Sequence, residues 1–217
     1  MNAQLEENKM KDLIKKGTTT VGIVCKDGVI LAADQRVSMG NLNVHKITKI
    51  EKITDNVAIT MAGSVGDNQL IIKYLRSQME LWTIRRGKKP SSRACATLLA
   101  NILAGGKGYF PFYVQMLLAG YDEDDKGHLF SLGPDGSLIE DNWISTGSGS
   151  VFAYGILDEY LKDKMLTTKE AIHIAVKAIN AAIRRDLYTG EGITVFVIDK
   201  KGVNKLSKTE IEKSLKK

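Results

Sequence analysis

Strand-like and helix-like segments follow one another in blocks along this chain, and that order limits its fold more than any other feature. Residues 18–34 predict two strands around a turn at Lys26-Asp27-Gly28, and residues 44–53 and 57–62 predict a second strand pair. Two helices, three strands, two more helices and a closing strand pair come after them. A Rossmann fold would alternate single strands and helices instead. The block order therefore predicts an α+β fold in which helix pairs cover two packed sheets, an αββα sandwich of four layers.

Apolar spacing and turn residues locate the remaining elements. The predicted elements are, in chain order, helices 67–86 and 90–104, strands 113–121, 127–133 and 137–147, helices 150–161 and 168–188, and strands 193–199 and 203–206. Asp67 or Asn68 is the candidate N-cap of the first helix and Gly87 its end, while Thr167 or Thr168 caps the last of the four.

Two of these helices carry apolar residues at helical spacing. The first has Leu70, Ile71, Tyr74, Leu75, Met79 and Trp82, and the last has Ala171, Ile174, Ala175, Ala178, Ile179 and Ala182. We expect each set to form one helix face, which serves either the core or contacts between subunits.

Composition excludes several classes of function. The net charge is +6, but residues 200–217 hold seven lysines against two glutamates, so the rest of the chain is close to neutral and a nucleic-acid-binding module is disfavoured. Cys25 and Cys95 are too few for a disulfide framework and are expected to be buried thiols. The three histidines are scattered, so no metal or other cofactor is expected. Without an apolar run of membrane length or a secretory signal, a cytoplasmic location is expected.

Residues 1–17 are polar and end at Gly17, directly before the threonine-rich strand that begins at Thr18. A threonine hydroxyl becomes a useful nucleophile when its own α-amine, freed by cleavage, takes its proton. The pKa of an α-amine is about 7.7–8.0, which suits neutral pH. Nucleotide binding and serine-hydrolase chemistry have little support, because no complete GxGxxG, P-loop or GxSxG string is present.

Four strings in this order resemble the catalytic β subunit of the proteasome in its archaeal form: GTTTVGIVCKDGVILAADQRVSMGN, ITMAGSVGD, STGSGSVFAYGILD and RRDLYTGEGI. The resemblance runs from Gly17 to about Ile198. It implies an N-terminal nucleophile hydrolase fold and a threonine endopeptidase that cuts itself between Gly17 and Thr18 and needs no cofactor.

The resemblance also assigns roles to individual residues. It implies Thr18 as nucleophile, Asp34 as the acid paired with the catalytic lysine, Ser148 and Asp186 as supports of the threonine amine, and Gly63 as the oxyanion-hole donor. For the lysine, counting back from Met61-Ala62-Gly63 selects Lys49, whereas counting forward from Thr18 reaches Ile50, so Lys46 and Lys52 stay as alternatives. Thr189 stands where the family has serine, and Glu191 where it has glycine.

The substrate pocket follows from the same resemblance, with Val37, Ser38, Met61 and Val65 at lining positions. A methionine at its floor indicates a preference for large hydrophobic residues at P1. The implied partners are proteasome α subunits, other β subunits in a seven-membered ring, unfolded polypeptides and, indirectly, an ATPase.

The expected domains are a removable propeptide (1–17), the hydrolase domain (18–206) and a basic tail (207–217) that forms a short helix or is disordered. A β subunit that keeps its propeptide and only builds the ring is the alternative.

Overall fold

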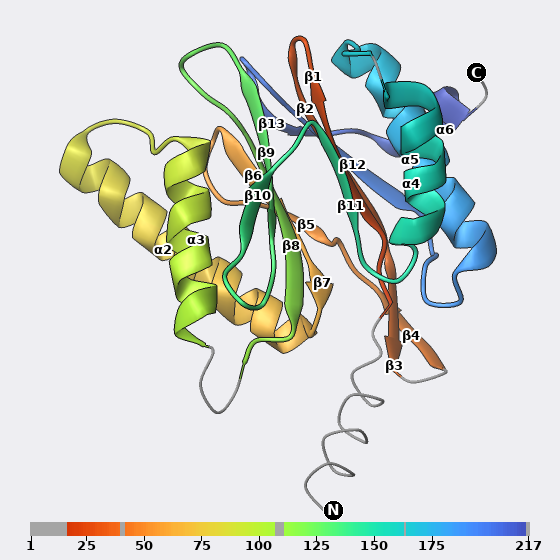
Figure 1. The fold of residues 1–217 in the computed structure, drawn as a ribbon, viewed down its shortest axis with the longest axis horizontal. Helices are drawn as coiled ribbons and strands as arrows, with labels where there is room; N and C mark the ends of the chain where they lie inside the picture. The colour runs from red at the N-terminus through yellow and green to blue at the C-terminus, as the bar shows by residue number, and fades with distance from the viewer. Residues whose placement is uncertain (1–16, 40–41, 107–110, 163, 216–217) are drawn as a thin grey trace, which may run out of the picture.

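Two antiparallel sheets form the centre of the computed structural model, which describes residues 17–39, 42–106, 111–162 and 164–215 (Figure 1). The first sheet has the order β11 (Trp143–Thr146), β1 (Thr20–Cys25), β2 (Gly28–Asp34), β12 (Ile193–Asp199) and β13 (Gly202–Lys205). The second has the order β10 (Leu138–Glu140), β9 (Gly127–Leu132), β8 (Val114–Tyr121), β6 (Val57–Thr60) and β5 (Ile50–Lys52), with β7 (Ala62–Gly63) beside β8. A separate hairpin joins β3 (Arg36–Met39) to β4 (Leu42–Lys46).

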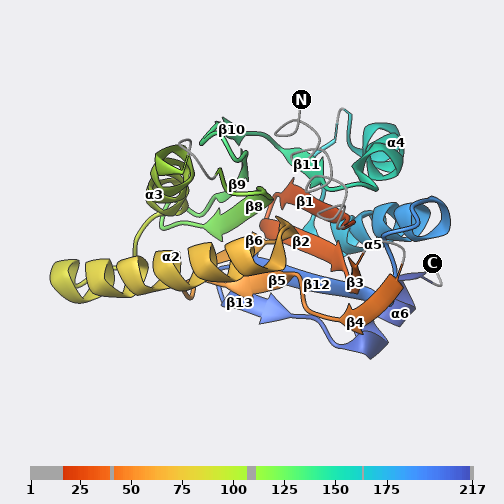
Figure 2. The same cartoon turned by 90° about the horizontal axis from the view of Figure 1, so that it is seen from below.

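Helices cover the outer face of each sheet (Figures 1 and 2). The helices are α2 (Val65–Arg86) and α3 (Ser92–Gly105) on the second sheet, and α4 (Ser150–Leu161), α5 (Thr168–Arg185) and α6 (Lys208–Leu215) on the side of the first. Three apolar clusters form the core. One lies between α2–α3 and the second sheet, one between the two sheets, and one between the first sheet and α4–α5. The four-layer sandwich predicted from the block order is confirmed.

The apolar face predicted for α5 is buried, and all six of its predicted residues lie in the core. Thr167 caps this helix in a capping box with Glu170, which satisfies backbone donors at the helix start. The helix ends at Arg185, three residues earlier than predicted, because Asp186 takes an extended conformation.

In α2 the prediction is only partly right. Ser64, not Asp67 or Asn68, is the N-cap. The Asp67 carboxylate does not cap the helix and accepts a hydrogen bond from the N–H of Tyr113. Gly87 ends the helix, as predicted, and takes the left-handed conformation. Ile71, Leu75 and Met79 are buried, but Leu70 and Tyr74 are exposed and Ile72 is buried in their place. Figure 2 shows the reason: the helix lies along the edge of the sheet and runs beyond it, so only a narrow stripe is covered.

Two predicted strands are each divided in the structure. Residues 44–53 contribute to β4, which pairs with β3, and to β5, which pairs with β6. Residues 137–147 contribute to β10 in the second sheet and to β11 in the first. Each break lets the chain pass from one sheet to another element, a choice that the apolar pattern does not encode.

Other predictions concern the thiols and the tail. Cys25 and Cys95 are buried free thiols, and burial raises the pKa of each to about 12. The tail forms α6, with Ile211 buried against the α4–α5 layer. Residues 1–16 of the expected propeptide lie outside the described residues.

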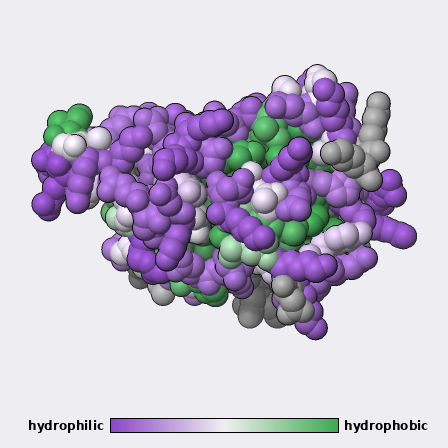
Figure 3. All heavy atoms as spheres, turned by 90° about the horizontal axis from the view of Figure 1, so that it is seen from above, coloured by the Kyte–Doolittle hydropathy of each residue, from purple (hydrophilic) through white to green (hydrophobic). Residues whose placement is uncertain are grey.

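The surface is mostly polar. Figure 3 shows one face that is mostly hydrophilic, with an apolar group at the far end of α2 and further apolar areas toward the middle of the face. Near the end of this helix the side chain of Ile84 is exposed. None of the described helices combines the length and apolarity needed to cross a lipid bilayer.

Candidate active site

Thr18 lies two residues before β1, and the β1–β2 hairpin brings the end of β2 beside this segment. The register pairs Thr20 with Ala33, so Asp34 lies next to Thr19. The Thr19 N–H donates to Asp34 Oδ1 at 3.0 Å. The turn that the sequence predicts therefore places this carboxylate next to the threonine run.

Asp34 is fully buried and accepts four hydrogen bonds. Three come from backbone N–H groups, those of Thr19, Arg36 and Gly190, each at 3.0 Å. The fourth comes from Lys49 Nζ at 2.8 Å. These four donors supply the hydrogen bonds that a carboxylate without access to water needs.

Lys49 is 2% exposed and donates to two oxygens, Asp34 Oδ1 and the Gly17 carbonyl oxygen, the latter at 3.3 Å. Burial lowers the pKa of its amine, and the Asp34 carboxylate opposes part of that shift. The two alternatives lie elsewhere: Lys52 pairs with Asp55 at the surface, and the Lys46 side chain is exposed. Of the three candidate lysines, Lys49 is the one that contacts this group.

A second polar cluster contacts Thr18 from the other side. The Thr18 N–H donates to Ser148 Oγ at 3.3 Å, and Ser148 Oγ donates to Asp186 Oδ2 at 2.5 Å. Thr189 Oγ1 donates to the same Asp186 oxygen at 2.5 Å and lies 2.7 Å from Thr19 Oγ1. The threonine at position 189 therefore keeps the hydroxyl contact, and Asp186, unfavourable at a helix C-terminus, is held by specific donors.

Gly63 lies near both clusters and lines the cavities on either side of Gly17. Its φ is +96°, and a Cβ there would lie 2.2 Å from the Tyr113 carbonyl oxygen. Only glycine fits this position without strain.

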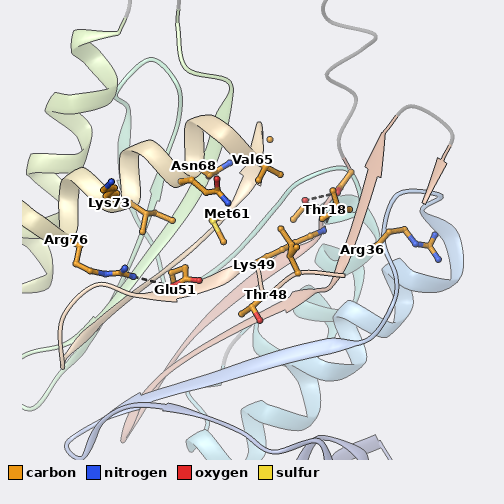
Figure 4. A pocket seen from close by; sticks show the side chains of 16 residues that line it. Thr18, Arg36, Thr48, Lys49, Glu51, Met61, Val65, Asn68, Lys73 and Arg76 are labelled. Carbon is orange, nitrogen blue, oxygen red and sulfur yellow. Dashed lines mark hydrogen bonds and ion pairs between the residues drawn. The ribbon is translucent and has the colours of Figure 1, made fainter. Parts of the chain in front are cut away.

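A cavity of about 500 Å³ opens beside Thr18 (Figure 4). Of the predicted lining residues, Val37, Met61 and Val65 line it, while the Ser38 side chain lies outside the described residues. Figure 4 shows Met61 between Thr18 and a charged far end of the cavity, where Arg76 pairs with Glu51 at 3.2 Å.

Sequence reasoning missed several residues of this cavity. They belong to one face of α2, namely Gln69, Ile72, Lys73 and Arg76. Their spacing of three and four residues predicts that they share one helix face. The spacing does not predict that this face is turned toward Thr18.

Chemically, the site combines a hydroxyl, an adjacent peptide carbonyl, an ammonium and two carboxylates, a set suited to acyl transfer. Thr18 Oγ1 donates to the Gly17 carbonyl oxygen at 2.7 Å, the oxygen that Lys49 also contacts. No group of three or more metal-ligating side chains occurs in the described part of the chain.

An αββα sandwich with a threonine directly before its first strand is the fold class of the N-terminal nucleophile hydrolases. A family model described as "Proteasome subunit" matches residues 14–198, and the chain belongs to that family. Family membership implies assembly into the proteasome core with other subunits.

Named relatives agree with this assignment. The chain is 49% identical to proteasome subunit beta 1 of Thermococcus sibiricus, over 93% of this chain and 96% of that protein. It is 48% identical to a proteasome subunit beta of Methanobrevibacter smithii, over 93% and 97%. It is 50% identical to that of Methanocaldococcus vulcanius, over 92% and 90%. The predicted resemblance to archaeal proteasome β subunits is confirmed.

Proposed function

We propose that this chain is a self-processing threonine endopeptidase of the proteasome core. In the first step Thr18 Oγ1 attacks the Gly17 carbonyl carbon. The bond from that carbon to the Thr18 nitrogen breaks, and the hydroxyl proton ends on the released amine. Water then hydrolyses the resulting ester, which frees residues 1–17 and leaves Thr18 with a free α-amine.

One observation carries this proposal: two donors converge on the Gly17 carbonyl oxygen. Thr18 Oγ1 lies 2.7 Å from it and Lys49 Nζ 3.3 Å. Negative charge develops on this oxygen when the carbonyl is attacked, so a buried ammonium at that point lowers the barrier. We propose that the Gly63 N–H also donates to this oxygen in the transition state, alongside Lys49.

After processing, the same hydroxyl attacks peptide bonds of other chains. The Thr18 amine accepts the proton and later activates water, as a general base with a pKa near neutrality. Lys49, held charged by Asp34, favours the neutral amine through like-charge repulsion. Ser148, supported by Asp186, holds that amine in place.

The cavity beside Thr18 is where we propose that the P1 side chain binds. Its near part is apolar, with Val37, Met61, Val65 and Ile72. We therefore propose a preference for large hydrophobic P1 residues, tested with peptides that differ only in leucine, phenylalanine, arginine or glutamate at P1. Turnover fastest with arginine or glutamate would contradict it.

The wider setting is also a proposal. We propose seven-membered β rings between rings of α subunits in the cytoplasm, with unfolded polypeptides delivered by an ATPase. The apolar part of α2 that the sheet leaves exposed supports further contacts in an assembly.

The deciding experiment is the intact mass of the full chain after co-expression with a proteasome α subunit. We expect a loss that matches residues 1–17, abolished by Thr18→Ala. An unchanged mass in assembled rings would contradict self-processing and favour the purely structural subunit. The variant Thr18→Ser is the matched control, because it keeps a hydroxyl and should still process.

A further inference from the structure

Residues 187–191, here called the 187–191 loop, contact both polar clusters around Thr18. Thr189 Oγ1 donates to Asp186 Oδ2 at 2.5 Å. The next residue, Gly190, donates its N–H to Asp34 Oδ2 at 3.0 Å. A shift of this loop would therefore disturb both carboxylates at once.

The Arg36 side chain holds this loop at two points. Its Nη1 donates to the Leu187 carbonyl oxygen at 2.7 Å, and its Nη2 lies 3.5 Å from Glu191 Oε1. The two contacts lie at opposite ends of the loop. Arg36 is itself fixed beside the site, because its backbone N–H donates to Asp34 Oδ2 at 3.0 Å.

The middle of the loop packs directly on the guanidinium. A Cβ at Gly190 would lie 2.5 Å from Arg36 Nη2, 2.6 Å from Cζ and 2.7 Å from Nε. The absence of a side chain at position 190 is what lets the guanidinium approach the loop backbone.

Glu191 supplies the carboxylate of the second contact. Its φ is +63°, a left-handed conformation that residues other than glycine adopt at a cost. A glutamate kept in this conformation places its carboxylate next to the Arg36 guanidinium.

We infer that Arg36 is a positioning residue of the proposed peptidase, which holds the 187–191 loop so that Asp34 and Asp186 keep their donors. Arg36 acts through the loop and does not touch the reacting atoms. The inference rests on the proposed function, because it concerns the rate of the same reaction.

Charge alone does not provide this contact. A guanidinium presents several N–H groups in a fixed plane and reaches a carbonyl and a carboxylate together, whereas a lysine ammonium is a single point charge. The Glu191 side chain is 39% exposed, so replacing Arg36 does not leave its partner's charge buried. We therefore expect the loss to appear in the reaction rate rather than in folding.

The test compares Arg36→Lys and Arg36→Met in the full chain co-expressed with an α subunit. Two rates are measured, self-cleavage between Gly17 and Thr18 and kcat for a peptide with leucine at P1. We expect Arg36→Met to lower both about tenfold or more, and Arg36→Lys to lower both by a smaller factor. Self-cleavage involves no added substrate, so a parallel loss excludes a role limited to binding peptides in the cavity.

The pH profile of kcat separates positioning from a general structural defect. The Arg36 cation contributes to the lowering of the pKa of Lys49. Its removal in Arg36→Met should therefore raise the pKa of Lys49 and move the alkaline limb of the profile to higher pH, whereas Arg36→Lys keeps the charge and leaves this limb in place. The matched control is Arg93→Lys, because Arg93 also contacts a carboxylate, Glu140, but lies on α3 at the surface.

Three outcomes are possible. If the wild-type chain itself fails to self-cleave in assembled rings, the proposed function fails and this inference fails with it. If the wild type is active and Arg36→Met has wild-type rates, the inference alone is wrong. If both Arg36 variants fail to assemble, or lose melting temperature in proportion to rate, the role is structural and the inference is overturned.

Discussion

Thr18 lies between two carboxylates of the same length whose surroundings differ. Asp34 is fully buried and bound by three backbone N–H groups and the Lys49 ammonium. Asp186 is half-buried at the end of α5, and two of its three donors are hydroxyl groups, those of Ser148 and Thr189. A buried carboxylate paired with a cation cannot be removed without leaving that cation in a low-dielectric interior. Hydroxyl donors can rotate to other acceptors. We therefore expect substitutions in the Asp186 cluster to cost less stability than those at Asp34, while they still lower activity.

The sharpest way to break this comparison is Asp34→Ala. It leaves Lys49 buried without its anion and three N–H groups without an acceptor. We expect the free energy of unfolding to fall by about 3–5 kcal/mol and self-cleavage to be lost. Urea denaturation and intact mass measure the two effects.

A double variant isolates the cause of that loss. Asp34→Ala combined with Lys49→Met removes both charges, so part of the stability should return while activity stays absent. A double variant less stable than Asp34→Ala alone would show that the N–H groups, not the buried cation, dominate.

Asp186→Asn tests the other cluster. Because this carboxylate is half-exposed, we expect a change in the free energy of unfolding of about 1 kcal/mol or less, with a loss in self-cleavage and peptide turnover of about 10–100-fold. A destabilisation as large as that of Asp34→Ala would remove the distinction between the two clusters.

The pH dependence sharpens the comparison further. Burial lowers the pKa of Lys49, while Asp34 and, to a smaller extent, Asp186 raise it. Removing either negative charge lowers this pKa further, so Lys49 loses its proton at a lower pH. If charged Lys49 is required, the alkaline limb of the kcat profile should move to lower pH, more in Asp34→Asn than in Asp186→Asn. The residual activity of both variants is measured with the same fluorogenic peptide. An equal shift in both would contradict the expectation that Asp34 raises the pKa of Lys49 more than Asp186 does.

The smallest effect on the cleavage rate is expected at Thr189, whose hydroxyl contacts both Asp186 and Thr19. Thr189→Val keeps the shape but removes the donor, so we expect a loss of about 1–3 kcal/mol in stability and a lower cleavage rate. Thr189→Ser keeps the hydroxyl and serves as the control, with near wild-type rates. Equal losses in the two variants would show that the methyl group matters instead.

Much of this site was predictable because it depends on local structure and on contiguous motifs. The tight turn after Cys25 fixes the register of the β1–β2 hairpin, and that register alone brings Asp34 beside Thr19. The cap of α5, predicted at Thr167 or Thr168, and the end of α2 at Gly87 were predictable for the same reason, since each depends on neighbours a few residues apart.

Other features depend on contacts between distant segments and could not be read from the pattern. The single strand expected at 137–147 divides between two sheets, and the α2 face that carries Lys73 and Arg76 turns toward the cavity. Arg36 gave no signal in the sequence, because its partners lie about 150 residues away in the 187–191 loop.

The lysine shows most clearly what each level decided. The sequence by itself determined the block order, the Gly17-Thr18 junction and the motifs that mark the family, because these depend on local propensity and on adjacent residues. It left Lys46, Lys49 and Lys52 open. Only the tertiary structure separated them, because the pairing of β5 with β6 and the packing of the two sheets bury one ammonium against Asp34 and leave the other two toward solvent. Burial is a property of the whole fold, and a string of residues does not contain it.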